Sequence, residues 1–126
     1  MTKSIADTNI LIEIYRNNPI SKLWFSTQQD IAIPSITWLE LMEGSRGKAG
    51  ERKNLQIIAQ FGMEFLTIAD QQWAMNQLLR FRLSHGVSFK DFLIASVCNR
   101  LQVPLFTKNV KDFLPMLNKQ LVISPY

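Results

Sequence analysis

Lys3-Ser-Ile-Ala-Asp-Thr-Asn9 leads directly into the apolar stretch Ile10-Leu-Ile-Glu-Ile-Tyr15 near the start of the chain. Ile5 and Ala6 predict a short buried strand, and the longer apolar stretch predicts a helix. Asp7 would therefore lie at the mouth of a strand-to-helix turn, where parallel α/β sheets bind their ligands. This stretch predicts an α/β fold with Asp7 at its functional edge.

The rest of the chain repeats the alternation of strand and helix without internal repeats or low-complexity tracts. We expect further strands at 31–34, 64–68, 103–106 and 121–123, and helices near 20–27, 35–43, 51–61, 70–85 and 88–101. Strands separated by helices imply parallel pairing through right-handed crossovers. The predicted fold is a three-layer α/β/α sandwich with a central, mostly parallel sheet of four or five strands, formed by one domain over residues 1–126.

Composition favours a globular protein. Hydrophobic residues make up 47% of the 126 residues and charged residues 19%, as in ordinary folded domains. No apolar run approaches the roughly 18 residues that span a bilayer, and the first residues lack the apolar segment of a signal peptide. The single Cys98 cannot form an internal disulfide, which suits a reducing compartment. We therefore expect a cytoplasmic protein that does not contact membranes.

The net charge of +4 conceals a sharper asymmetry. If four of the ten acids gather at one site, six remain against fourteen Lys and Arg residues. Such a surface would attract a polyanion, although an ordinary basic surface explains the charge equally well. The most basic stretch is interrupted by Gly44, Gly47 and Gly50 and is predicted to be mobile. Its cations, which would contact an RNA backbone or simply face solvent, are Arg46, Lys48, Arg52 and Lys53.

Four carboxylates, Asp7, Glu40, Asp91 and Asp112, occupy predicted helix starts. A structural interpretation is available for each: Asp7 as a helix cap, and the other three as the acids of capping boxes that begin at Thr37, Ser88 and Asn109. Only Asp91 lacks an immediately preceding strand. Glu43, three residues after Glu40, competes with it for the same role.

A second interpretation takes the four acids together. In a parallel sheet the carboxyl ends of the strands meet at one edge, so these caps would crowd together. Carboxylates that close repel one another unless a cation neutralises them. A cluster of oxygen ligands without His or Cys selects a hard ion, Mg²⁺ or Mn²⁺. Nearby polar side chains would orient the acids or hold metal-bound water; they are Thr8, Asn9, Thr107 and Asn109.

The motifs also resemble those of a known family. Asp7-Thr8-Asn9 after an N-terminal strand looks like the first motif of the PIN-domain nucleases, and Glu40-Leu-Met-Glu-Gly44 resembles the second. Asp91-Phe-Leu-Ile-Ala95 resembles the third, and Thr107-Lys-Asn-Val-Lys-Asp-Phe113 the fourth. The likeness spans nearly the whole chain, in order.

Within that family, the short single-domain form is the VapC-like toxin of a type II toxin–antitoxin pair. The resemblance implies an endoribonuclease that depends on Mg²⁺ or Mn²⁺, cuts tRNA or ribosomal RNA, forms a homodimer and is silenced by a VapB-like antitoxin. It makes Asp7, Glu40, Asp91 and Asp112 the catalytic and metal-binding acids. The chain departs from many relatives at Asn109, where they have another acid, so a second metal position is in doubt.

Two other functions stay open. A non-catalytic module would keep the scaffold for binding RNA or protein, and a phosphatase would use Asp7 as a nucleophile but lacks a second nearby aspartate as its acid. Trp24 and Phe25 would either pack in the core or line a groove for an antitoxin helix or a second subunit, while Trp38 is expected in the core.

Overall fold

The protein contains one five-stranded sheet in which every neighbouring pair is parallel, with strand order β3-β2-β1-β4-β5. The structure is a computed structural model that describes residues 1–126. The strands are β1 (Ser4–Ala6), β2 (Ile31–Pro34), β3 (Gly62–Glu64), β4 (Leu105–Phe106) and β5 (Val122–Ile123). The expectation of a parallel sheet within an α/β fold is therefore confirmed.

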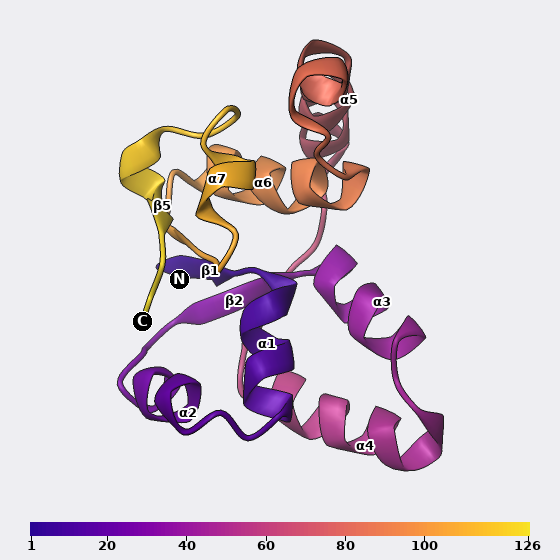
Figure 1. The fold of residues 1–126 in the computed structure, drawn as a ribbon, viewed down its shortest axis with the longest axis vertical. Helices are drawn as coiled ribbons and strands as arrows, with labels where there is room; N and C mark the ends of the chain where they lie inside the picture. The colour runs from indigo at the N-terminus through magenta and orange to yellow at the C-terminus, as the bar shows by residue number, and fades with distance from the viewer.

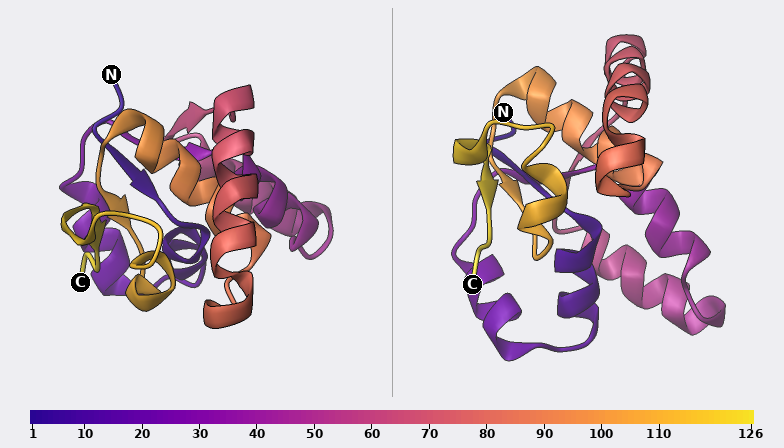
Figure 2. Two further views of the ribbon diagram at one scale, coloured as in Figure 1. Left: turned by 90° about the horizontal axis from the view of Figure 1, so that it is seen from above. Right: turned by 45° about the horizontal axis from the view of Figure 1, so that its top comes forward.

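Helices connect the strands and cover both faces of the sheet (Figure 1). They are α1 (Thr8–Tyr15), α2 (Pro19–Ser26), α3 (Ser35–Glu43), α4 (Gly47–Ile58), α5 (Ile68–His85), α6 (Phe89–Leu101) and α7 (Val110–Phe113), followed by a 3₁₀ turn η1 (Lys119–Leu121). Helix α5 packs mainly on α6 and stands away from the sheet (Figures 1 and 2). None of these helices is both long and apolar enough to cross a membrane.

Alternating strand residues divide the interior into two apolar clusters. Ile5 and Ala32 join the cluster formed with α5, α6 and α7. Ala6, Ile31 and Ile33 join the cluster formed with α1, α3 and α4. Because successive side chains of a strand point to opposite faces of a sheet, these short strands contribute to both clusters, which produces the three-layer sandwich.

Two predicted boundaries are wrong. Gly47 to Gly50, predicted as a mobile loop, form the first turn of α4, with Gly47 in the left-handed region (φ 65°) and Gly50 buried near the Tyr15 hydroxyl. The strand predicted at 64–68 instead occupies Gly62–Glu64. Thr67 and Asp70 form a capping box that begins α5, which ends the extended segment.

The strand order creates a topological switch point between β1 and β4. From β1 the chain adds β2 and β3 on one side, and it later returns to add β4 and β5 on the other. Asp7 follows β1 and Thr107 follows β4, so the two residues meet at this crevice. Ligands of open parallel sheets bind at such a position, outside the carboxyl ends of the strands.

Asp70 has a structural role away from this crevice. Its buried carboxylate accepts hydrogen bonds from the Thr67 amide at 3.0 Å and from Arg100 Nε at 3.0 and 3.1 Å. We predict that Asp70→Ala lowers the free energy of unfolding by about 1–3 kcal/mol, because the Thr67 amide and the Arg100 guanidinium lose their buried acceptor. Urea unfolding checks this. Asp30→Asn is the control, since the pair of Asp30 with Lys3 is exposed and should contribute below about 1 kcal/mol, and Asn tolerates the left-handed backbone at this position (φ 57°). Equal losses would contradict the prediction.

Candidate metal centre

Asp7 is held in a fixed orientation at the switch point. Its side chain is only 4% exposed. One carboxylate oxygen accepts a hydrogen bond from the Thr8 amide at 2.7 Å, and the other accepts one from the Thr107 hydroxyl at 2.7 Å. The Thr107 hydroxyl oxygen also accepts the Asn109 amide at 2.9 Å. Asp7 therefore caps α1 and, at the same time, ties β1 to β4.

Glu40 reaches the same region from α3. The Thr8 hydroxyl donates to Glu40 Oε1 at 2.9 Å and lies 3.0 Å from the Thr37 hydroxyl. Since a hydroxyl has one proton, Thr8 accepts from Thr37 when it donates to Glu40. The buried threonines thus form a chain that aims Glu40 toward the crevice. Glu43, in contrast, is exposed on the last turn of α3.

The capping-box interpretation fails for Glu40 and Asp112 and holds in part for Asp91. Helix α3 begins after Pro34 without a side-chain cap, so Thr37 and Glu40 form no box. Ser88 caps α6 through the Lys90 amide, and a backbone hydrogen bond from Ser88 lowers the pKa of Asp91, so this acid keeps half of a capping box. Asn109 makes no side-chain cap on α7. Glu40 and Asp112 are therefore not engaged in completing helix ends.

The four acids share one electrostatic environment. Burial is the main cause that raises the pKa of Asp7 from 3.8 to about 6, with Glu40 and Asp112 adding repulsion and the bonds from Thr107 and Thr8 opposing the rise. Burial also raises the pKa of Asp91 to about 6, reinforced by the charges of Asp7, Asp112 and Glu40. Asp91 on α6 and Asp112 on α7 thus act on the same electrostatic environment as Asp7 and Glu40.

The carboxylates do not yet form a coordination sphere. No three Asp, Glu, His or Cys side chains lie close enough together to hold a metal ion as they stand. The two Asp7 oxygens already accept hydrogen bonds from Thr8 and Thr107. Glu40 lies 3.9 Å from the ammonium of Lys90. The chemistry of this donor set fits a hard divalent ion, and the spacing means that the side chains would turn inward to bind it.

The polar neighbours divide into two groups. The Thr8 and Thr107 side chains contact the acids directly. Asn9 instead accepts the Lys108 amide at 3.4 Å, and Asn109 contributes its amide rather than its side chain. Neither asparagine side chain touches a carboxylate. Sequence reasoning missed Lys90 and Thr37, although Lys90 directly precedes Asp91 and so lay beside a recognised motif.

The aromatic side chains of α2 pack inside the fold. The Trp24 ring meets the Phe106 ring edge-on at 5.0 Å, and Phe25 stacks on Phe61 at 4.5 Å. The apolar side chains that α2 leaves in solvent are Ile20 and Leu23. Trp24 and Phe25 are thus half-buried within the fold, and their place in a groove for a partner stays a prediction. Half-buried Trp38 packs on the same cluster as Ile33.

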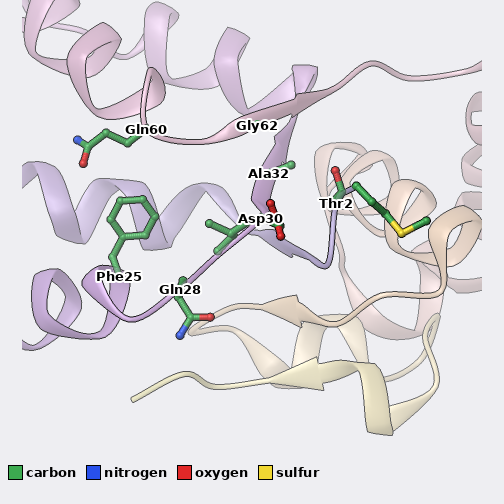
Figure 3. Close-up of a pocket in the computed structure, with 9 residues that line it drawn as sticks. Thr2, Phe25, Gln28, Asp30, Ala32, Gln60 and Gly62 are labelled. Atoms are coloured by element: carbon green, nitrogen blue, oxygen red, sulfur yellow. The ribbon is translucent and has the colours of Figure 1, made fainter.

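A separate cavity lies at the opposite edge of the sheet (Figure 3). It measures about 350 Å³ and is lined by Thr2, Asp30, Gly62 and neighbouring residues at the amino ends of the strands. Its one acid, Asp30, pairs with Lys3 at 3.6 Å. A single exposed carboxylate does not make a divalent metal site, so the chemistry favours the crevice at Asp7.

Cys98 is unsuited to chemistry at this crevice. It is fully buried in α6, and burial, with a contribution from the negative charge of Asp7, raises the pKa of its thiol far above the ordinary value. A neutral buried thiol is neither a nucleophile nor a metal ligand.

The raised pKa values predict how stability changes with pH. A carboxyl whose pKa is near 6 in the folded state and 3.8 in the unfolded state binds its proton more tightly when folded. The free energy of unfolding of the metal-free protein should therefore fall as pH rises from about 4 to 7, by about 1.4 kcal/mol per pKa unit. Urea unfolding in a chelator measures this dependence. Asp7→Asn should make the free energy of unfolding depend less on pH. A variant curve parallel to the wild-type curve would contradict the raised pKa of Asp7.

Comparisons with known proteins agree with this architecture. Solved structures of the same fold include a toxin–antitoxin complex from Klebsiella pneumoniae, with a TM-score of 0.78, 23% identity and 98% of both chains covered. Another is VapBC2 from Rickettsia felis bound to a promoter DNA fragment, with a TM-score of 0.73, 23% identity, and 95% and 96% covered. The sarcin–ricin-loop-cleaving toxin VapC20 of Mycobacterium tuberculosis has a TM-score of 0.68, 15% identity, and 92% and 97% covered.

Sequence comparison shows the family. No curated protein sequence matches the chain significantly. The PIN domain family model matches residues 5–114, which begin in β1 and end just after α7. That range contains Asp7, Glu40, Asp91 and Asp112. The chain therefore belongs to the PIN domain family.

Proposed function

We propose that residues 1–126 form one nuclease domain, a metal-dependent endoribonuclease that hydrolyses RNA phosphodiester bonds. The observation that carries this proposal is the buried carboxylate of Asp7 at the switch point, coupled electrostatically to Glu40, Asp91 and Asp112. Such a concentration of negative charge is unfavourable unless a cation is bound. Transfer RNA or ribosomal RNA is the proposed substrate, and the sarcin–ricin-loop-cleaving activity of a similarly folded toxin supports an RNA target.

Asp7, Asp91, Asp112 and Glu40 would hold Mg²⁺ or Mn²⁺. When bound, the ion lowers the pKa of water and stabilises negative charge on the phosphate. Asp7 and Glu40 are positioned by Thr107 and Thr8, which limits the movement that binding requires. Asn109 supplies no carboxylate, so we propose one well-held ion.

Lys90 would compensate charge in two ways. Its ammonium lies 3.9 Å from Glu40, and its side chain is 37% exposed, so the side chain can leave this position at small cost. In the metal-free protein it offsets part of the negative charge. With a cation bound among the acids, the ammonium is free to meet the phosphate of the substrate.

The basic residues of the α3–α4 region would hold the RNA backbone. Arg46 precedes α4, and Lys48, Arg52 and Lys53 lie on it. Lys48 pairs with Glu51 at 3.3 Å, and the Lys53 ammonium lies 4.2 Å above the Tyr15 ring. Phosphate contacts of this kind fix the position of a strand without reading its sequence.

We also propose that the protein is the toxin of a toxin–antitoxin pair, held by a VapB-like antitoxin, and that it acts as a homodimer in the cytoplasm. Similarly folded toxins from Klebsiella pneumoniae and Rickettsia felis were solved with antitoxins, which supports such a partner. Exposed apolar side chains on one face of α5, among them Met75, Leu79 and Leu83, favour association with another protein surface.

Association can be tested directly. Leu79→Glu, combined with Leu83→Glu, should shift a dimer to a monomer in sedimentation experiments, because charges on these exposed positions oppose apolar contact and leave the fold unchanged. Arg82→Glu on the same helix controls for added negative charge. A wild-type protein that sediments as a monomer would contradict the proposed homodimer.

A non-catalytic RNA-binding module is the alternative function. It predicts RNA binding without cleavage and indifference to the acids. The absence of three acids at coordination distance favours this alternative, whereas the mutual repulsion at Asp7 and Asp91 favours a metal site.

The decisive prediction concerns Asp7 and Asp91. Digestion of tRNA and ribosomal RNA should require Mg²⁺ or Mn²⁺ and stop with chelator. Asp7→Asn or Asp91→Asn should lower cleavage by at least about 100-fold, because removing a ligand exceeds the effect of an outer partner. Calorimetry with Mn²⁺ alone should show weaker binding in both variants.

Glu43→Gln is the matched control, because this exposed acid lies one helical turn from Glu40. It should keep wild-type cleavage and Mn²⁺ affinity, whereas Glu40→Gln should lower both. Full cleavage by Asp7→Asn would remove the acid cluster from the mechanism. RNA binding without cleavage by any form of the protein would establish the alternative function.

A further inference from the structure

A second cavity opens beside the acid crevice, between α1, α3 and α4. It measures about 470 Å³. Thr8 and Glu40 line it, and these residues belong to the candidate metal centre. Arg16 and Arg46 also line it, so carboxylate and guanidinium groups share one continuous cavity.

The two arginines have no partner within the protein. Neither Arg16 nor Arg46 forms an ion pair or a side-chain hydrogen bond, and both are exposed. Arg16 closes the end of α1 and Arg46 precedes α4, so elements far apart in sequence bring them to one cavity. Lys48 lies nearby but pairs with Glu51. Both arginines that line the cavity are therefore free to bind a ligand.

The cavity extends along α1. Thr8 begins this helix and Arg16 follows its last residue, and eight helical residues span about 12 Å. Ile12, Tyr15 and Leu41 supply apolar wall between the two ends. A ligand that fills the cavity must therefore be extended, with an apolar middle and an anionic group at the arginine end.

We propose that this cavity binds the single-stranded RNA segment on one side of the scissile phosphate, with a flanking phosphate held by Arg16 and Arg46. The proposal rests on the endoribonuclease function. It adds Arg16 to the residues that contact substrate. It also gives Arg46 a role inside the cavity, which the basic residues on α4 do not line. Guanidinium groups bind phosphate oxygens through paired donors, and the apolar wall accommodates the sugar and base.

RNA fits this cavity better than an acidic protein segment does. Its Glu40 end is negative and, once it carries a cation, suits a phosphate that bridges to the next nucleotide. Acidic side chains of a protein would pair with the arginines, but nothing at the Glu40 end of the cavity would attract them. A nucleic-acid strand has regularly repeated charge and satisfies both ends.

The test measures RNA affinity apart from cleavage. A short single-stranded RNA with a fluorescent end is titrated into protein carrying Asp7→Asn, with Mg²⁺ present, at several salt concentrations. Arg16→Ala and Arg46→Ala should each weaken binding about 5- to 10-fold and lower the salt slope by about 0.7, the value for one lost phosphate contact on a single strand. Arg82→Ala, an exposed arginine on α5, is the matched control and should change neither quantity.

Cleavage by protein with an intact Asp7 gives the second measurement. Arg16→Ala and Arg46→Ala should raise KM with kcat within about twofold of wild type, because they remove uniform binding. Affinities and slopes equal to those of Arg82→Ala would overturn the proposal. A second outcome would also overturn the proposal: wild-type protein binds a polyglutamate peptide, the arginine variants do not, and their RNA affinity is unchanged. That outcome would assign the cavity to a protein segment. Loss of cleavage in Asp7→Asn is independent of these outcomes.

Discussion

The hydrogen bond from the Thr107 hydroxyl to the buried carboxylate of Asp7, 2.7 Å long, joins residues 100 positions apart. It crosses the switch point between β1 and β4, where the two halves of the sheet diverge. A buried charge is costly unless hydrogen bonds satisfy it. The Thr107 hydroxyl and the Thr8 amide donate the hydrogen bonds that Asp7 needs. Because Thr107 reaches Asp7 only when β4 lies beside β1, the position of Asp7 depends on the order of the strands.

Negative charge is concentrated around this bond and only partly compensated. Burial and the neighbouring acids favour the protonated forms of Asp7 and Asp91. Lys90 faces Glu40 from the edge of the cluster, with its ammonium still partly in solvent. Repulsion between carboxylates is therefore confined to one edge of the sheet. Elsewhere the hydrogen bonds are complete, since no buried side-chain polar atom lacks a partner. Strain confined to a cleft is typical of functional sites.

Predictions from the sequence were accurate where the pattern was local. The strand Ile31–Pro34 was predicted at its observed bounds because four consecutive apolar residues precede a helix start. The predictions were wrong where exposed apolar residues gave the pattern of a strand. Phe65 and Ile68 are 73% and 77% exposed, and Thr67 caps the helix α5, which starts at Ile68. Likewise, three glycines suggested a loop, although the Gly50 amide donates to the Arg46 carbonyl at 3.2 Å and Gly47 to Gly50 form the first turn of α4.

By itself, the sequence determined the alternation of strands and helices, the parallel sheet and the place of Asp7 after the first strand, because these follow from short-range periodicity and turn chemistry. Only the tertiary structure decided that Glu40 and Asp112 are free of capping roles and that the four acids share one electrostatic environment. It also decided that Lys90 faces Glu40 and that Arg16 shares a cavity with Arg46. These relations depend on strand order and helix packing over long separations, which local patterns do not encode.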